Sequence, residues 1–170
     1  MAFTGAAIVM GVSSCGKTTV GEEFAKRLGV GFIEGDKLHP VANVEKMSSG
    51  VALTDDDRWS WLAEVGKALA GTQGMIGSCS ALKKIYRQRI AQAAGRPVAF
   101  IFLDGNRELL ETRIAARKGH FMPPSLLDSQ LKTLEPPGPD EWAVRLDIAQ
   151  HVDELVAEAT AFLQERDNHG

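Results

Sequence analysis

A glycine-rich segment near the N-terminus carries the strongest chemical signal in the sequence. It fits the pattern G-x-x-x-x-G-K-[ST] and consists of Gly11, Val12, Ser13, Ser14, Cys15, Gly16, Lys17 and Thr18. Glycines let successive backbone N–H groups turn inward on phosphates, and the N-terminus of a following helix favours negative charge. We therefore expect residues 11–18, together with Thr19, to bind the phosphates of a nucleoside triphosphate. Lys17 should bridge the β- and γ-phosphates, and the Thr18 hydroxyl should coordinate Mg²⁺.

Two acids, Glu34 and Asp36, follow a short apolar segment at residues 31–33. If that segment is a strand of an α/β sheet, both acids lie at its carboxyl edge, where such proteins bind ligands. Asp36 would then accept a proton from an attacking hydroxyl group, and Glu34 would hold Mg²⁺ through a water molecule. The alternative for Asp36 is a capping role in the turn that follows.

The elements that must position these residues alternate between strands and helices. Apolar segments typical of buried strands occur at residues 6–10, 31–33, 75–79, 98–103 and 144–148, and helical patterns lie between and after them. This alternation predicts right-handed βαβ units and a three-layer α/β fold, with a five-stranded parallel sheet covered by helices on both faces. Two stretches interrupt it, at residues 38–57 and 118–139. We interpret the first as the start of an acceptor-binding insertion over about residues 38–70. We interpret the second as a lid.

Length and charge exclude several classes of protein. A chain of 170 residues is long enough for one sizeable core, so we expect a single domain over residues 1–170. The net charge of −3, without long runs of like charge, argues against a nucleic-acid partner. The first apolar stretch is too short for a signal peptide or a membrane span, which predicts a cytoplasmic protein with no membrane partner.

The two cysteines, Cys15 and Cys79, lack paired C-x-x-C spacing, so we expect free thiols rather than a disulfide or a zinc site. Cys15 is either a small space-filling residue of the loop or an accessible thiol with a lowered pKa.

The loop by itself does not say what happens to the triphosphate. A GTPase would carry an N/T-K-x-D motif, but no lysine of the chain is followed two residues later by aspartate. A mechanical ATPase would place an acid after an apolar strand, and Asp104 is the one tempting match. The segment Asp104-Gly105-Asn106 is equally typical of a turn that leads to an asparagine helix cap. The short chain also leaves little room for the accessory parts of a motor.

Five separated blocks make the prediction more specific. Their sequences are EGDKLHP at residues 34–40, NVEKM at 43–47, LTDDDR at 53–58, CSALKKIYR at 79–87 and ARKGHFM at 116–122. With the glycine-rich loop they resemble the P-loop gluconokinases, which are relatives of shikimate and adenylate kinases. The resemblance implies a nucleoside-monophosphate-kinase type of P-loop NTPase fold, ATP:D-gluconate 6-phosphotransferase activity, Mg²⁺ dependence and a homodimer.

Several residues in these blocks suit an acceptor that carries a carboxylate and hydroxyl groups. Arg58 is suited to planar, bidentate recognition of the carboxylate, although a solvated helix position is its alternative. Ser80 is expected to bind the acceptor and could also cap the next helix. Lys83 and Arg87 share one face of that helix, where they would bind acceptor hydroxyls or the carboxylate or else form a solvated basic face. His39 would bond hydroxyl groups or else anchor the turn before a proline.

The acids ahead of Arg58 look like a metal cluster at first sight. Asp55, Asp56 and Asp57 follow Thr54, however, and Thr54 with Asp57 fits a capping box at the start of a helix. We expect that structural role for them.

The segment Arg117-Lys118-Gly119-His120 has the composition of a lid, with cations to meet the transferring phosphoryl group and a glycine that allows movement. Arg117 is the best candidate there for catalysis and ATP binding, and Arg113, one turn earlier on the same helical face, is expected to help bind the phosphates. His120 is expected near the acceptor. Two rival hypotheses remain: a kinase of another small acid or of a nucleotide, and a module that binds ATP without turnover.

Overall fold

Five strands form one parallel sheet in the computed structural model, which describes residues 3–51, 53–116 and 124–169. The strands are β1 (Ala6–Met10), β2 (Gly31–Glu34), β3 (Met75–Ser78), β4 (Val98–Asp104) and β5 (Ala143–Asp147). Their order is β2-β3-β1-β4-β5, and every neighbouring pair is parallel. All five predicted strands are therefore present, with ends that differ by at most one residue.

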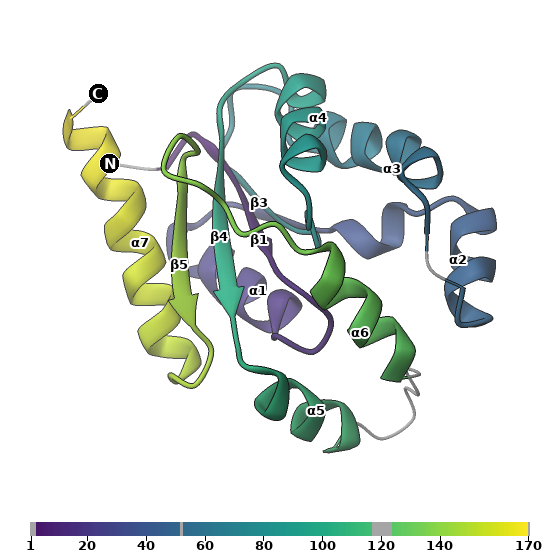
Figure 1. The fold of residues 1–170 in the computed structure, drawn as a ribbon. Coiled ribbons are helices and arrows are strands. Elements are labelled where there is room, and N and C mark those ends of the chain that lie inside the picture. Colours follow the sequence, from purple (N-terminus) through teal and green to yellow (C-terminus); the bar gives the residue numbers. More distant parts are fainter. Residues whose placement is uncertain (1–2, 52, 117–123, 170) are drawn as a thin grey trace.

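Helices connect the strands and cover both faces of the sheet (Figure 1). They are α1 (Lys17–Leu28), α2 (Val41–Ser48), α3 (Asp55–Ala68), α4 (Lys84–Ala94), α5 (Arg107–Ala116), α6 (Pro124–Thr133) and α7 (Val152–His169), with a short 3₁₀ helix, η1 (Gly35–Leu38). The connection from β1 to β2 runs one way along the sheet, and that from β3 to β4 runs the other way. Right-handed crossovers in opposite directions place α1 and α4 on opposite faces.

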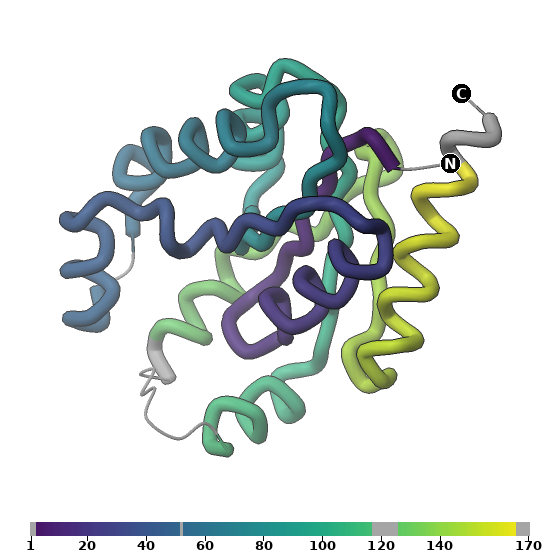
Figure 2. Tube along the Cα trace, turned by 180° about the vertical axis from the view of Figure 1, so that it is seen from behind, coloured from purple at the N-terminus to yellow at the C-terminus, as the bar shows by residue number. Residues whose placement is uncertain are grey.

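The two layers of helices differ in their partners. Helices α1 and α7 lie side by side on one face, as the view from behind shows (Figure 2). On the other face α4 packs against β4, and α3 packs against α4. The three-layer α/β prediction is confirmed.

Strand β1 lies at the centre of the sheet because its sequence is apolar on both sides. Its five residues, AAIVM, have no exposed surface, which is typical of a parallel strand with helices on both faces. The glycine-rich loop starts where this strand ends, so the loop is anchored to a fully buried strand at the centre of the sheet.

Local capping signals in the sequence mark several helix ends correctly. Thr54 and Asp57 form a complete capping box at the start of α3, and Gly29 ends α1 with a φ of 70°. Asn106 Oδ1 accepts the N–H of Leu109 at 2.8 Å, as expected of a cap at the start of α5.

One cap prediction is wrong. Helix α4 begins at Lys84, and Lys83 rather than Ser80 is its N-cap residue.

The two interruptions of the pattern hold short helices. Residues 38–57 contain the end of η1, all of α2 and the first residues of α3. The stretch at 118–139 contains α6 and the chain after it, while residues 117–123 lie outside the described residues. The acceptor-binding and lid roles of these segments stay predictions. No helix in the described ranges has both the length and the apolar character needed to cross a membrane.

Candidate functional site

The loop between β1 and α1 depends on glycine for its shape. Gly11 and Gly16 have φ values of 149° and 93°. A Cβ atom on Gly11 would lie 2.7 Å from Cys15 Sγ and 2.8 Å from the Leu103 carbonyl oxygen, so no larger residue fits. Lys17, the first residue of α1, donates from Nζ to the Val12 carbonyl oxygen at 3.0 Å. The lysine ammonium therefore lies over the loop, where phosphate would bind.

An oxygen pair beside the loop fits a magnesium ion. Thr18 Oγ1 donates to Glu34 Oε1 at 3.3 Å, which joins the start of α1 to the end of β2. Mg²⁺ prefers oxygen ligands and is commonly held by one or two protein oxygens together with phosphates. No group of three or more His, Cys, Asp or Glu residues that could hold a metal occurs among the described residues. A metal at this place would therefore depend on the nucleotide as well as on the protein.

A cavity of about 530 Å³ opens beside Lys17. Its walls come from the loop, η1, α2, α3, the chain before α4 and α6. The lining residues that bear on the chemistry are Ser13, Lys17, Asp36, His39, Arg58, Trp61, Ser80, Ser129 and Gln130. The cavity thus joins Lys17 of the glycine-rich loop to an acid, a guanidinium group and several hydrogen-bonding side chains.

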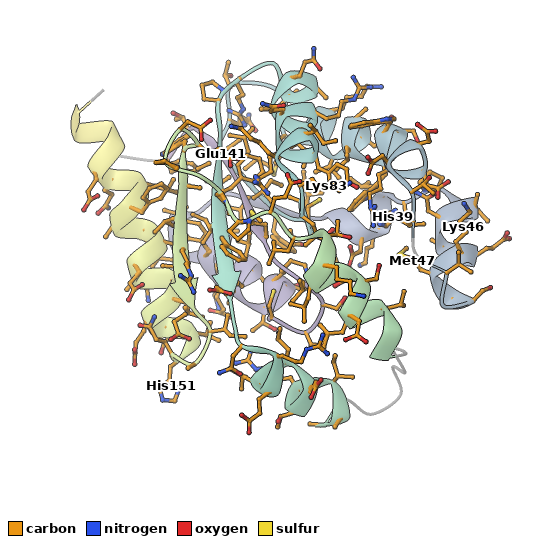
Figure 3. All side chains as sticks on the ribbon, viewed as in Figure 1. His39, Lys46, Met47, Lys83, Glu141 and His151 are labelled. Atoms are coloured by element: carbon orange, nitrogen blue, oxygen red, sulfur yellow. The ribbon has the colours of Figure 1, made fainter. Side chains whose placement is uncertain are left out.

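His39 is held flat against Trp61 at this cavity. The two ring centroids are 3.8 Å apart with an angle of 17° between planes, and Trp61 Nε1 donates to the Gly35 carbonyl oxygen at 2.8 Å. Figure 3 shows His39 on the α2 side of the molecule, far from His151 near α7. Burial lowers the pKa of His39 to about 4 against the opposing effect of Asp36, and Arg58 lowers it further. His39 is therefore neutral at pH 7 and suited to hydrogen bonding.

Arg58 extends from α3 to the cavity and is supported from α4. Its NH1 donates to the Tyr86 hydroxyl at 2.9 Å, and its guanidinium carbon lies 5.2 Å from the centroid of that ring. One side of the guanidinium group is thus supported by an aromatic ring.

Arg113 ties the far side of the loop to the neighbouring strand connection. It donates to the carbonyl oxygens of Cys15 at 3.3 Å and Ile148 at 2.9 Å. Cys15 itself is 1% exposed, and burial raises its pKa. Cys15 is therefore a space-filling residue, and the alternative of an accessible, acidified thiol is wrong.

Comparison with known proteins agrees with this geometry. A family model described as an AAA domain matches residues 7–137. A gluconokinase of Gluconobacter oxydans (strain 621H) is 46% identical over 164 residues, with 94% of this chain and 92% of the relative covered. A thermoresistant gluconokinase of Escherichia coli (strain K12) is 43% identical over 156 residues, with 88% of each chain covered.

A solved structure of a gluconokinase is also similar to this chain. The crystal structure of a gluconokinase from Sinorhizobium meliloti 1021 superposes with a TM-score of 0.91 at 48% identity, and 99% of this chain and 97% of that chain are covered. The chain belongs to the gluconokinase family. A shikimate kinase from Aquifex aeolicus, at 13% identity and a TM-score of 0.60, shows the wider P-loop kinase fold alone.

Among the acceptor residues predicted for this gluconokinase-family chain, four line the cavity: Asp36, His39, Arg58 and Ser80. Ser80 contributes from the loop after β3, where its carbonyl oxygen accepts the Gly11 N–H at 3.3 Å. Arg117 and His120 lie outside the described residues, so their roles stay predictions.

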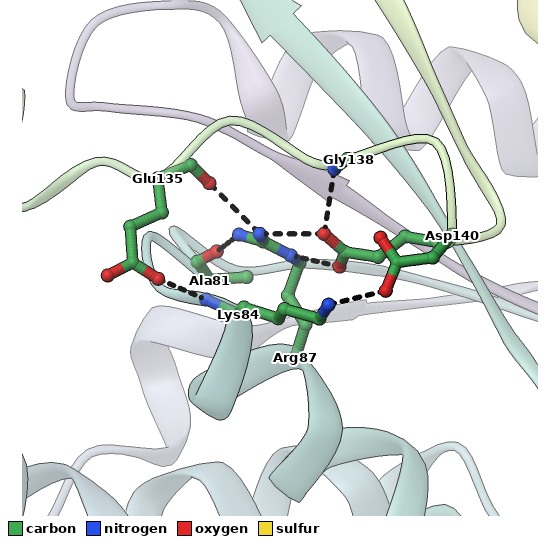
Figure 4. A network of polar contacts seen from close by, with 7 residues as sticks. Ala81, Lys84, Arg87, Glu135, Gly138 and Asp140 are labelled. Atoms are coloured by element: carbon green, nitrogen blue, oxygen red, sulfur yellow. Dashed lines mark hydrogen bonds and ion pairs between the residues drawn. The ribbon is translucent and has the colours of Figure 1, made fainter.

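Arg87 departs from the expected acceptor role. Its side chain is 1% exposed, and Nε donates to Glu141 Oε1 at 2.7 Å. The rest of the guanidinium group donates to Glu141 Oε2 and to the carbonyl oxygens of Ala81 and Glu135, as Figure 4 shows. Such a buried and bonded cation has no free face for an acceptor, so the structure corrects the prediction. Arg87 instead fixes the segment after α6 to the start of α4.

Lys83 is also engaged by the protein. Its Nζ lies 3.2 Å from Asp55 Oδ1 and 5.6 Å from the centroid of the Tyr86 ring. The other acids of this stretch are used structurally as well, since Asp57 completes the capping box and pairs with Lys46 at 2.8 Å. A metal site at these aspartates is therefore not supported.

Sequence reasoning missed Gln130 and Tyr86. Gln130 Oε1 accepts the Ser13 N–H at 2.7 Å and so connects α6 directly to the phosphate-binding loop across 117 residues of chain. Nothing local marks this glutamine, because its partner is a backbone group far away in the sequence. Tyr86 lies inside one of the recognised blocks, and its proximity to Arg58 emerges only when α3 packs on α4.

Proposed function

We propose that this protein transfers the γ-phosphoryl group of ATP to D-gluconate and releases 6-phospho-D-gluconate and ADP. The observation that carries the proposal is the cavity in which Lys17, Asp36 and Arg58 meet in a chain of the gluconokinase family. A phosphate-binding cation, a base for a hydroxyl group and a guanidinium group for a carboxylate are the three groups that this reaction needs.

The division of work follows from the position of each residue. Backbone N–H groups of the loop other than those of Gly11 and Ser13 would hold the phosphates together with the Lys17 ammonium, and Arg113 would support the loop through the Cys15 carbonyl oxygen. Asp36 would orient the acceptor hydroxyl and take its proton. Arg58 would bind the gluconate carboxylate, and His39 and Ser80 would bond its hydroxyl groups.

Mg²⁺ belongs to the proposal as well. Thr18 would coordinate it directly and Glu34 through water, and the metal would neutralise charge on the phosphates. Arg117 and His120 retain their predicted parts in a lid. A cytoplasmic location and a homodimer are further proposals, which rest on the resemblance to the gluconokinases.

A coupled assay of ADP release across sugar acids and neutral sugars tests the proposal. We expect D-gluconate to be the best acceptor and turnover to require Mg²⁺. Lys17→Ala should remain folded and lose almost all activity, because the substitution removes a charge from the phosphates and no core contact. A better turnover with another small acid would reassign the acceptor. Wild-type turnover in Lys17→Ala would refute the role of the loop.

A further inference from the structure

The groups between α3 and α4 form a second layer behind the acceptor cavity. This α3–α4 polar cluster consists of Asp55, Arg58, Lys83 and Tyr86. Asp55 and Arg58 lie three residues apart on α3, and Lys83 and Tyr86 lie three apart at the start of α4. Only Arg58 of the four lines the cavity.

The Tyr86 hydroxyl connects Arg58 to Asp55 through two hydrogen bonds, one that it accepts and one that it donates. It has a single proton, which it donates to Asp55 Oδ1. It must therefore accept, rather than donate, in its 2.9 Å bond with Arg58 NH1. Tyr86 is 1% exposed, and burial followed by the Asp55 carboxylate raises its pKa to about 12, so the proton stays in place at pH 7.

The charges of the cluster leave one cation unmatched. Lys83 Nζ lies 3.2 and 3.4 Å from the two carboxylate oxygens of Asp55 and so pairs with that acid. Within the described part of the chain, Arg58 forms no ion pair with a carboxylate. Two cations and one carboxylate leave a single positive charge, which lies on the residue that faces the cavity. This matches an acceptor with one carboxylate.

We propose that Tyr86 is a positioning residue that holds the Arg58 guanidinium toward the acceptor carboxylate, while the Lys83–Asp55 pair keeps that guanidinium free of an internal carboxylate partner. The inference rests on the proposed function, because Arg58 is taken to bind gluconate. It assigns Lys83 a role behind the cavity in place of direct acceptor contact. A long arginine side chain otherwise samples many rotamers, so a fixed hydrogen bond and a ring beneath it lower the entropy lost on binding.

Tyr86→Phe tests this role because it removes only the hydroxyl group and keeps the ring under Arg58. We expect the KM for gluconate to rise about tenfold, the effect of losing one hydrogen bond to a charged group. The kcat and the KM for ATP should stay within about twofold of wild type. Trp59→Phe is the matched control, since Trp59 meets the Tyr86 ring edge-on at 6.1 Å between centroids. That control should leave all three parameters unchanged.

A double-mutant cycle separates positioning from a merely structural role. If Tyr86 acts through Arg58, then adding Tyr86→Phe to Arg58→Ala should not raise the KM for gluconate any further. Additive effects would overturn the inference, as would a KM for gluconate in Tyr86→Phe within about twofold of wild type, or an equal rise for ATP. The wild-type protein is assayed first. Wild-type turnover with gluconate means that a negative result bears on Tyr86 alone, while no turnover overturns the proposed function and this inference together.

Discussion

Asp36 illustrates how one side chain becomes available for chemistry. A backbone hydrogen bond closes the turn that contains Asp36, because the Asp36 carbonyl oxygen accepts the His39 N–H at 3.4 Å. In the described part of the chain the Asp36 carboxylate forms no hydrogen bond, and it lines the cavity. The alternative of a side-chain cap is therefore not what the structure has.

We predict that Asp36→Asn lowers kcat by roughly 10²-fold or more, the usual scale for loss of a general base. Asparagine keeps the size of the side chain and removes only the basic oxygen. Steady-state kinetics with a separate measurement of ATP affinity check this, and the ATP affinity should barely change. If positioning outweighs proton removal, the loss appears mainly as a higher KM for gluconate. Near-normal kcat and KM would remove Asp36 from the mechanism.

His39 should make the stability of the protein depend on acid. Burial lowers its pKa to about 4 in the folded protein, against the raising effect of Asp36 and with a further lowering by Arg58, compared with about 6.5 for an unfolded histidine. Between these values the unfolded chain binds a proton that the folded chain does not. The contribution of neutral His39 is thus fully present above about pH 6.5 and is lost as the pH falls toward 4.

Chemical unfolding of wild type and His39→Gln between pH 7.5 and pH 4 measures this contribution. The wild type should lose more of its free energy of unfolding over that range than the variant, whose side chain does not titrate. Parallel pH curves for the two proteins would contradict the low pKa.

At the scale of elements, the site depends on how α6 and the chain after it are attached. Gln130 bonds α6 to the loop, and the segment 135–141 is fixed to α4. Glu135 contributes through its backbone N–H, which donates to the Leu82 carbonyl oxygen at 2.7 Å, and Lys84 pairs with Asp140. The stretch from α6 to residue 141 is therefore bonded to the phosphate-binding loop at Gln130 and to α4 at residues 135–141.

Arg87→Met should lower the free energy of unfolding by about 3–5 kcal/mol, the usual cost of removing one partner of a buried ion pair. Glu141 would be left without its cation, and its side chain is only 11% exposed. The double variant Arg87→Met/Glu141→Leu is the control and should recover much of the loss, because no unpaired charge remains. Urea unfolding measures both. An Arg87→Met protein as stable as wild type would show that the network contributes little.

At the scale of the whole molecule, the strand order brings the site together. The crossovers leave the neighbouring strands β1 and β3 in opposite directions, and such a switch point is where open α/β sheets bind ligands. The loop follows β1 and Ser80 follows β3, while η1 follows the edge strand β2. Carboxyl ends of three parallel strands thus supply the cavity with residues from distant parts of the chain.

The same packing should protect both cysteines. Cys15 and Cys79 are 1% and 0% exposed, and burial raises the pKa of each thiol, that of Cys79 to about 12. We expect iodoacetamide to leave both unmodified in the folded protein and to modify both after unfolding in urea, as mass spectrometry would show. MgATP should make little difference under native conditions. Rapid modification of native Cys15 that MgATP slows would contradict its buried position.

Much of the fold was predictable because its signals are local. Strands such as β1 are continuous apolar runs, and helix ends are marked by Gly29, Asn106 and the Thr54–Asp57 capping box. The phosphate-binding loop was equally clear, since its spacing and its place between a strand and a helix are both visible in one short segment.

The sequence by itself predicted a loop that binds a nucleoside triphosphate and the candidates Lys17, Asp36 and Arg58, and its resemblance to the gluconokinases implied the reaction. It could not decide which cations line the cavity. Lys83 and Arg87 look alike in the sequence, yet each is matched by an acid that only folding brings near, Asp55 from α3 and Glu141 from beyond α6. Tertiary packing decides which cation can bind a ligand, because a lysine or arginine that pairs with an acid of the protein is no longer free to pair with the ligand.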